Sequence, residues 1–481
     1  MPRAAKGKMA VWCVVIAAAV LLLCSKSSPL FVLNDWMDAN IFFTMGKSLF
    51  NGKVLYRDVF DHKGPVLYLV YGLGWLLDHT GFTGVFVLEV LAFAVFLAEG
   101  LHCAALWTGR PLHPAWAVLP AVAVAASRSF SHGGSAEELL LPLLGAALCA
   151  LLAGLERQRP MPGKAVLLHG LLAGCALWLK YTVLGFYLVW VALLTVWYIR
   201  HHWWRALGRS CGLYLAGMAL ATLPWGVYFG IHGALGDWFT AYFYDNLFLY
   251  SGTGGGVVAL AQHFWWAVRD ALPGAALTAL FVVWAAVTRH RKAAMAVCLL
   301  AGGLGLTSLM GGYLVYYGLV MAVFVPLGLV PLATLAARIP LPAPGARLLP
   351  AAVLALGVAG CWVGSPNAPL RGRDAEAMPQ YRFAQTIAET PGATLLNYGT
   401  LDGGFYTATG LLPPCRYFCV TNMPLQDQWT QQDALLENGD VVYAVALVGN
   451  LQDRFPRYRC IDQCSCDGGE GTVTWYLYQR Q

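Results

Sequence analysis

The sequence has 481 residues, of which 58% are hydrophobic and only 12% are charged, and its mean hydropathy is +0.58. A soluble protein carries about 25% charged residues. The composition therefore excludes a soluble globular enzyme and predicts a polytopic α-helical membrane protein. The net charge of +6 comes from basic residues scattered in short loops, a pattern that sets orientation in a membrane and does not predict nucleic-acid binding.

Apolar segments bounded by charges predict about eleven membrane spans. The basic residues of the N-terminus and of alternate loops then share one side, which the positive-inside rule places in the cytoplasm. We interpret the first segment as an uncleaved anchor, because Leu23 before Cys24 is not the small residue that a signal-peptide cleavage site needs; a cleaved signal peptide is the alternative. The predicted spans are residues 9–24, 82–108, 114–128, 137–155, 165–180, 182–199, 210–231, 272–288, 293–310, 313–336 and 348–364.

One further apolar segment, residues 63–80, is short and contains Pro65 and two glycines. We predict a juxtamembrane or re-entrant helix that does not cross, because a crossing there would reverse the side of every later basic loop. Residues 263–272 are predicted to form an amphipathic helix on the membrane surface.

The sequence predicts two domains, a transmembrane domain at residues 1–364 and a soluble α/β domain at residues 365–481. In the second, residues 380–390 are expected to be helical and residues 393–398, 440–447 and 472–478 to be strands. An odd number of crossings places this domain outside the cytoplasm. Its five cysteines would allow up to two disulfides there, but their spacing does not give the connectivity.

The loop at residues 34–65 gathers acids and bases beside the predicted membrane edge, where ionisable groups are costly and usually functional. Asp35 and Asp38 are three residues apart and would share a face if both were helical; the alternative is that one of them caps the following helix. The run Gly46–Ser48 (GKS) invites a P-loop interpretation, but the glycine that the motif needs five residues earlier is Ile41. Protease, hydrolase and dinucleotide motifs are also missing from the sequence.

From Asp38, the loop continues through Tyr-Arg-Asp (56–58) and His-Lys-Gly-Pro (62–65), and it resembles the first external loop of GT-C membrane glycosyltransferases. Protein O-mannosyltransferases and lipid A aminoarabinose transferases belong to that superfamily. Segments 131–148, 176–190 and 223–250 resemble further motifs of the same superfamily, in the same order. The resemblance implies the GT-C fold and the inverting transfer of a sugar from a polyprenyl-phosphate carrier to an acceptor hydroxyl on the outer face of the membrane.

The resemblance also implies roles for individual residues. It makes Asp38 the general base, with Asp35 as the second choice, and it makes Lys63 the cation that stabilises the leaving phosphate. A membrane-edge anchor is the alternative for Lys63. The residues that it assigns to the carrier phosphate or the sugar are Tyr56, Arg57, His62, Glu137, Glu138, Lys180, Asn246 and Tyr250.

Several of these assignments have structural alternatives. Arg57 would equally pair with a neighbouring aspartate, and Lys180 would equally extend from a span end to the interface. Glu137 and Glu138 would suit the start of any helix. Asn246 and Tyr250 would suit the membrane interface.

The implied partners are a polyprenyl-phosphate sugar donor, membrane lipid and a glycan, lipid or protein acceptor of the cell envelope, with no nucleic acid. We expect no cofactor, because a full second Asp-x-Asp motif that would support a divalent metal is missing. The alternatives from other classes are a transporter or flippase of lipid-linked glycans, which would need ionisable groups within its spans, and a non-catalytic envelope assembly protein.

Overall fold

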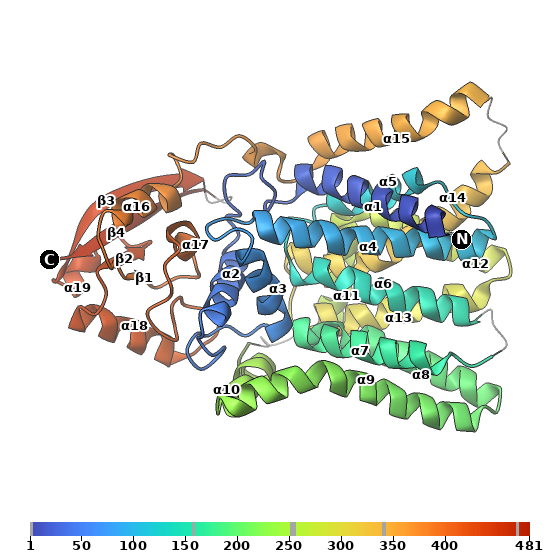
Figure 1. Cartoon of the computed structure of the whole chain (residues 1–481), viewed down its shortest axis with the longest axis horizontal. Coiled ribbons are helices and arrows are strands. Elements are labelled where there is room, and N and C mark those ends of the chain that lie inside the picture. Colours follow the sequence, from blue (N-terminus) through green and yellow to red (C-terminus); the bar gives the residue numbers. More distant parts are fainter. Residues whose placement is uncertain (1–2, 156–158, 251–255, 339–342, 468–470) are drawn as a thin grey trace. The chain divides into compact units, whose positions relative to one another are not determined.

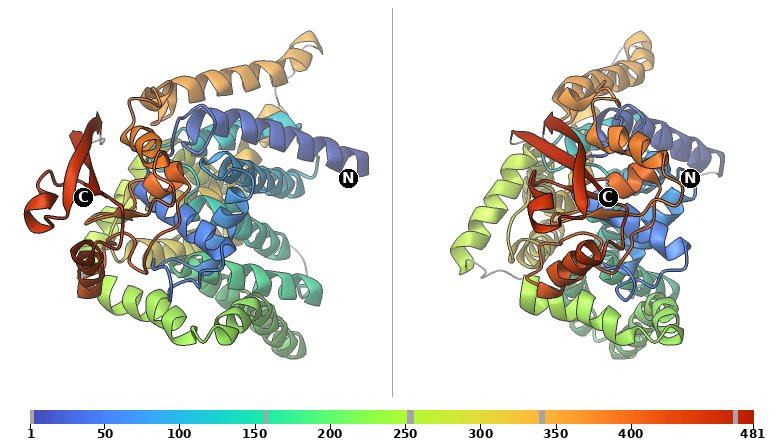
Figure 2. Two further views of the ribbon diagram at one scale, coloured as in Figure 1. Left: turned by 60° about the vertical axis from the view of Figure 1, so that its left-hand side comes forward. Right: turned by 90° about the vertical axis from the view of Figure 1, so that its left-hand side faces the viewer.

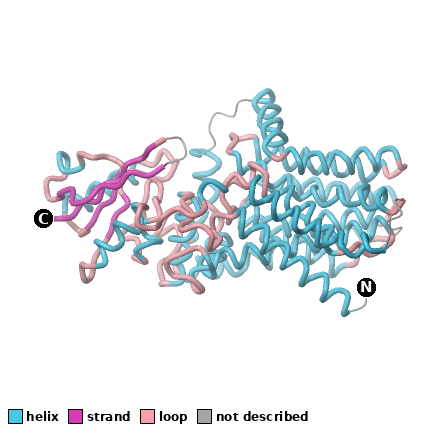
Figure 3. The backbone as a smooth tube through the Cα atoms, turned by 90° about the horizontal axis from the view of Figure 1, so that it is seen from above, coloured by secondary structure: helices cyan, strands magenta, loops and turns pink. Residues whose placement is uncertain are grey.

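The computed structural model describes residues 3–155, 159–250, 256–338, 343–467 and 471–481. Helices make up most of the chain, and the described strands lie only in its C-terminal part (Figures 1 and 3). Contacts divide the chain into two compact units. Unit 1 comprises Met1–Ser28, Val87–Pro224 and Thr253–Pro369, and unit 2 comprises Pro29–Phe86, Trp225–Gly252 and Leu370–Gln481. The boundary predicted at residues 364–365 concerns membrane crossing and stays a prediction.

Unit 1 consists of helices. Where α8 and α13 cross, a Cβ atom at Gly185 would lie 2.1 Å from the carbonyl oxygen of Gly303, so the close approach requires glycine. The elements lying wholly or mostly in unit 1 are α1 (Arg3–Cys24), α4 (Thr83–Thr108), η1 (Pro114–Ala117), α5 (Val118–Ala125), α6 (Ala136–Leu155), α7 (Gly163–Leu179), η2 (Tyr181–Val183), α8 (Leu184–Arg200), α9 (Trp204–Ile231), α11 (Gly256–Asp270), α12 (Leu272–Val287), α13 (Arg291–Leu309), η4 (Val315–Gly328), α14 (Leu329–Ala336), α15 (Ala343–Gly364) and η5 (Ala368–Leu370).

Seven of the described helices are long and apolar enough to cross a membrane, and there are eight if α11 and α12, which meet at a 102° bend, form one broken span. Their outer faces carry exposed aliphatic side chains such as Leu215 and Val227 of α9, as expected where lipid replaces water. A helix lies at each of the eleven predicted segments. The chain is a multi-pass membrane protein; the count of eleven crossings and their orientation stay predictions.

Unit 2 combines helices with the C-terminal sheet. Helix α3 has 11 residues and is about 16 Å long, which is too short to cross the ~30 Å hydrocarbon core. This length agrees with the prediction that residues 63–80 do not cross. The helices of this unit are α2 (Met37–Phe50), α3 (Pro65–Trp75), α10 (Leu235–Phe239), the π-helical η3 (Thr240–Tyr250), α16 (Pro379–Ala388), α17 (Phe405–Thr409), α18 (Gln426–Asn438) and α19 (Leu451–Arg454).

Four strands form one sheet in the order β1-β2-β4-β3, seen in red in Figure 2. β1 (Leu395–Asn397) runs parallel to β2 (Tyr443–Ala446), and β4 (Thr472–Arg480) runs antiparallel to β2 and to β3 (Tyr458–Asp467). Three predicted strands and the helix at 380–390 are confirmed. β3 and α18 were not predicted. β3 reads YRCIDQCSCD, which has few β-branched or aromatic residues to mark a strand. All thirteen cysteines lie among the described residues and are free thiols.

Candidate functional site

Helices α2 and α3 pack side by side in unit 2 and run in the same direction. The Phe42 ring of α2 contacts the Tyr68 ring of α3, and four residues further along both helices a Cβ at Gly46 would lie 2.4 Å from the amide nitrogen of Gly72. The equal spacing keeps the two helices in step. One turn back along each helix, the first turns of α2 and α3 therefore lie at the same end of the pair. Asp38 is in the first turn of α2, and Lys63 directly precedes the N-cap of α3.

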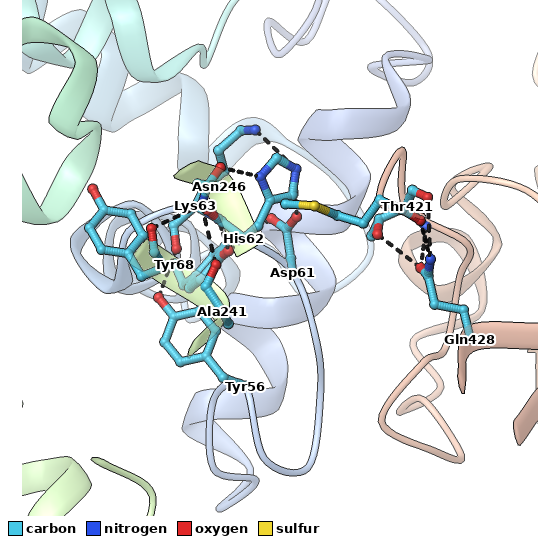
Figure 4. A network of polar contacts seen from close by, with 11 residues as sticks. Tyr56, Asp61, His62, Lys63, Tyr68, Ala241, Asn246, Thr421 and Gln428 are labelled. Atoms are coloured by element: carbon cyan, nitrogen blue, oxygen red, sulfur yellow. Dashed lines mark hydrogen bonds and ion pairs between the residues drawn. The ribbon is translucent and has the colours of Figure 1, made fainter. Parts of the chain in front are cut away.

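Two buried tyrosines fix the backbone on both sides of Lys63 (Figure 4). The Tyr56 hydroxyl donates to the Lys63 carbonyl at 2.7 Å, while the Tyr68 hydroxyl accepts from the Lys63 N–H at 2.9 Å and donates to Asp61 at 2.8 Å. Tyr56 has φ +66°, a strained backbone conformation for a non-glycine residue. Such strain is kept only where the surroundings fix it, and it is frequent at functional sites.

His62 is held by Asn246 of the π-helical segment η3, 184 residues away in the sequence (Figure 4). The Asn246 amide nitrogen donates to the backbone carbonyls of His62, Ala241 and Tyr242, which assigns its oxygen to the side facing His62 Nδ1 at 2.9 Å. His62 Nδ1 therefore carries a proton that it donates to Asn246, and Nε2 lies 3.8 Å from an oxygen of the Asp61 carboxylate. The Tyr250 ring packs on the His62 ring at 4.7 Å between centroids.

The Lys63 ammonium lies 3.3 Å from His62 Nε2 and 5.5 Å from the centre of the Tyr250 ring. Within the described part of the chain, no carboxylate lies within ion-pairing distance of this ammonium. The nearby Asp61 carboxylate is buried and bonded to Tyr68; burial raises its pKa, and the positive charge of Lys63 opposes that shift. Lys63 is thus a half-buried cation on a fixed loop, with donor capacity available for an anion.

The two candidate bases differ in structure. Asp35 precedes α2, so the two acids do not share a helical face as predicted. Asp35 lies 3.5 Å from Arg373, which also binds Asp467 at 3.1 Å. Asp38 is partly buried in the first turn of α2, whose N-cap is Trp36 without a side-chain cap bond. Neither acid is therefore the N-cap, which was the alternative interpretation.

Arg57 adopts the structural alternative considered for it. Its guanidinium makes a forked pair with Asp58, with N–O distances of 2.8 and 3.1 Å, and donates to the His232 carbonyl at 2.8 Å. This pair lowers the pKa of Asp58. A role for Arg57 in phosphate binding stays a prediction.

In unit 1, Lys180 and Glu137 form an ion pair. Lys180 follows α7 directly, and its ammonium also lies 4.0 Å from the centre of the Tyr317 ring. Glu138 accepts a hydrogen bond from the Gly134 N–H at 3.0 Å at the start of α6. Glu137 thus contacts a cation, whereas Glu138 accepts from a backbone amide; a role for either in binding substrate stays a prediction.

The sequence did not single out Tyr68, Asp61 or Tyr317. Each acts next to a predicted residue, but a tyrosine in an apolar helix carries no signal that separates it from an ordinary core aromatic. No group of three or more His, Cys, Asp or Glu residues among those described is arranged to hold a metal ion. The expectation that no cofactor is used stays a prediction.

Neither the protein-family models nor the curated proteins contain a match to this sequence. Two solved structures are similar over nearly the whole chain: ArnT from Cupriavidus metallidurans bound to undecaprenyl phosphate, and the same protein in the apo state. The first has a TM-score of 0.66 at 15% identity, covering 97% of this chain and 98% of ArnT. The second has a TM-score of 0.66 at 16% identity, covering 98% of each chain.

The chain has the fold of ArnT. The GT-C fold predicted from the loop motifs is thereby confirmed, including the polytopic helical part and the small C-terminal sheet. ArnT is similar along its whole length, so the C-terminal segments of unit 2 belong to the shared fold and are not an appended module.

Proposed function

We propose that this protein is a membrane glycosyltransferase that moves a sugar from a polyprenyl-phosphate carrier to an acceptor hydroxyl, with inversion. The observation that carries the proposal is Lys63, a cation that forms no ion pair with a carboxylate among the described residues, held at the same end of the α2–α3 pair as Asp38. The ArnT fold supports it, since one ArnT structure holds undecaprenyl phosphate. We further propose that the reaction takes place on the extracytoplasmic face.

The proposed chemistry needs a base and a cation. As the acceptor oxygen attacks the anomeric carbon, Asp38 takes the hydroxyl proton. The bond between that carbon and the phosphate oxygen breaks, and its electron pair stays on the phosphate, where Lys63 stabilises the added charge. The phosphate is already a good leaving group, so no general acid is required.

We favour Asp38 over Asp35 as the general base. Asp35 is held in an ion pair with Arg373. Asp38 lies on the helix that packs in step with α3, so its position relative to Lys63 is fixed by regular structure. We retain Lys180, Glu137, Glu138, Arg57, His62, Tyr56, Asn246 and Tyr250 as residues proposed to bind or orient the carrier phosphate or the sugar.

The purified full-length protein, incubated with a panel of radiolabelled undecaprenyl-phosphate sugars, tests the proposal. We expect transfer or slow hydrolysis of one donor, which would also identify the sugar. Asp38→Asn should reduce turnover by about 10²–10⁴-fold while binding of undecaprenyl phosphate persists. Glu437→Gln, an exposed acid on α18, is the matched control and should leave turnover unchanged.

Two results would contradict the proposal. Full turnover in Asp38→Asn would refute its role as the base. Binding of undecaprenyl phosphate without consumption of any donor in the panel would refute the transferase proposal and favour a carrier-transport protein.

A further inference from the structure

One face of α2 packs against residues 402–411, within unit 2. Asn40, Thr44 and Lys47 lie on this face at spacings of four and three residues, and each is at most 1% exposed. The Thr44 hydroxyl donates to the carboxylate of Asp402 at 2.7 Å. The Lys47 ammonium donates to two backbone carbonyls, those of Tyr406 at 2.7 Å and Leu411 at 2.6 Å. The short helix α17 accordingly lies next to α2 (Figure 1).

Lys47 is an unusual residue for this interior position. Burial of an ammonium group is costly unless the group is fully hydrogen bonded, and here burial lowers the pKa of Lys47 to about 7. An apolar side chain of similar length would fill the space without that cost. The ammonium provides what an apolar chain lacks, namely two directed bonds that fix the end of α2 against specific carbonyls.

Asn40 fixes the other end of the same helix. Its amide nitrogen donates to the carbonyls of Asn34 at 2.8 Å and Trp36 at 3.0 Å, which shapes the turn that leads into α2. Its amide oxygen accepts from the hydroxyl of Thr407 at 2.8 Å. One buried side chain therefore joins the turn that contains Asp35 to the C-terminal segment.

Asp38 lies away from this contact face. With 100° per residue, Asn40, Thr44 and Lys47 cluster within about 60° of one another around the helix, and Asp38 lies about 150° from their centre. Contacts on one face of a helix fix its rotation about its axis and its position along that axis. The contacts with residues 402–411 therefore constrain the backbone position of Asp38 on α2.

We propose that residues 402–411 are a positioning element for the base, in which Thr407, Asp402 and the carbonyls bound by Lys47 hold the rotation of α2 and aim Asp38 at the acceptor hydroxyl. This inference rests on the proposed function. It assigns the C-terminal part of the chain a role in setting the active-site geometry. A misplacement of about 1 Å costs on the order of 100-fold in rate.

Thr407→Val tests the proposal, because it removes the hydroxyl that bonds to Asn40 and keeps the shape of the side chain. Thr407→Ser keeps the hydroxyl and should rescue the variant. Thr390→Val is the matched control, since it removes a side-chain hydrogen bond of 2.7 Å to Tyr443 that does not involve α2. Each full-length variant is measured by hydrogen–deuterium exchange of residues 34–41 and by kcat and KM for the undecaprenyl-phosphate sugar found in the panel above.

For Thr407→Val we expect exchange of residues 34–41 to rise about fivefold and kcat to fall about 10- to 100-fold with KM for the donor unchanged. Thr407→Ser and Thr390→Val should match the wild type in both measurements. Lys47→Met should reproduce the exchange effect at residues 44–50.

Unchanged exchange in Thr407→Val overturns the proposal, and so does raised exchange with unchanged kcat. A wild-type protein that consumes no donor refutes the proposed function and removes the positioning role. In that case the exchange measurement still decides by itself whether residues 402–411 hold α2.

Discussion

Replacement of Lys47 by methionine should change how the stability of the protein depends on pH. Lys47 is 1% exposed and its ammonium bonds to two carbonyls. Burial lowers the pKa of Lys47 from its usual 10.5 to about 7, although the nearby Asp402 carboxylate opposes the shift. Methionine fills similar space but does not titrate, so the difference between wild type and Lys47→Met reports chiefly on Lys47, with a smaller contribution from Asp402, whose pKa the Lys47 charge lowers.

The sign and size of the effect follow from proton linkage. Between pH 7 and 10.5 the unfolded chain holds more protons at Lys47 than the folded chain does, so stability rises with pH in this window. Each pH unit within it corresponds to about 1.4 kcal/mol, so the free energy of unfolding of the wild type, relative to Lys47→Met, should rise by about 2–3 kcal/mol from pH 7 to pH 9.

Asp402 affects this window only slightly, because the charge of Lys47 is the smallest of the effects on its pKa. Burial raises the pKa of Asp402 from 3.8 to about 6, so its contribution to stability is present at low pH and is lost as the pH rises through about 6. Above pH 7 the carboxyl is ionised in both states, and its effect is constant.

Thermal unfolding of the full-length protein in detergent, followed by tryptophan fluorescence at pH 7, 8 and 9, measures the effect. We expect the midpoint difference between wild type and Lys47→Met to change by about 3–5 °C across this range, at roughly 1–2 °C per kcal/mol for a chain of this size. Lys292→Met, at an exposed lysine, should follow the wild type. An equal midpoint difference at pH 7 and pH 9 would show that Lys47 does not titrate near neutral pH and would refute this reasoning.

Three further outcomes are expected. Lys63→Met should lower kcat by about 10²–10³-fold, because it removes the charge next to the leaving phosphate. Lys63→Arg keeps the charge and should retain more activity in the same donor assay. Equal loss of activity in both variants would show that the charge is not the decisive property. Gly46→Ala should lower the free energy of unfolding by about 1–3 kcal/mol, because the new Cβ would lie 2.4 Å from the amide nitrogen of Gly72. Gly212→Ala is the control: the space around Gly212 is open, so the free energy of unfolding should not fall. Tyr68→Phe should cost about 1–3 kcal/mol in thermal stability by leaving a buried carboxylate short of one donor, and an unchanged midpoint would contradict that.

The helical membrane part was predictable because hydropathy is a local property of the sequence. A helix lies at each predicted span, and the short segment at residues 63–80 contains the 11-residue helix α3. β3 could not be predicted in the same way. Its polar, cysteine-rich sequence gains strand structure from pairing with β4 along its length, which is a tertiary effect.

The sequence was sufficient to predict which residues belong to the candidate site, but it was not sufficient to predict how they are arranged in space. The loop motifs located Lys63 and His62, yet nothing local connects them to Asn246, 184 residues away from His62. The same limit explains Lys47, which the sequence showed only as part of a failed P-loop. Its partners are two backbone carbonyls more than 350 residues away, and a carbonyl group carries no sequence signal.

Charged residues are scarce in this chain, so the bonding partners of the charged groups in unit 2 are informative. Lys47 is bonded to carbonyls, the Asp61 carboxylate accepts from a tyrosine, and Arg57 pairs with its neighbouring aspartate. Each of these groups has structural partners that account for its burial or its position. Lys63 differs, because its ammonium contacts an imidazole nitrogen of His62 and an aromatic ring. A cation held rigidly with such partners, at the helix end that also carries Asp38, is the arrangement that phosphate release and proton removal require together.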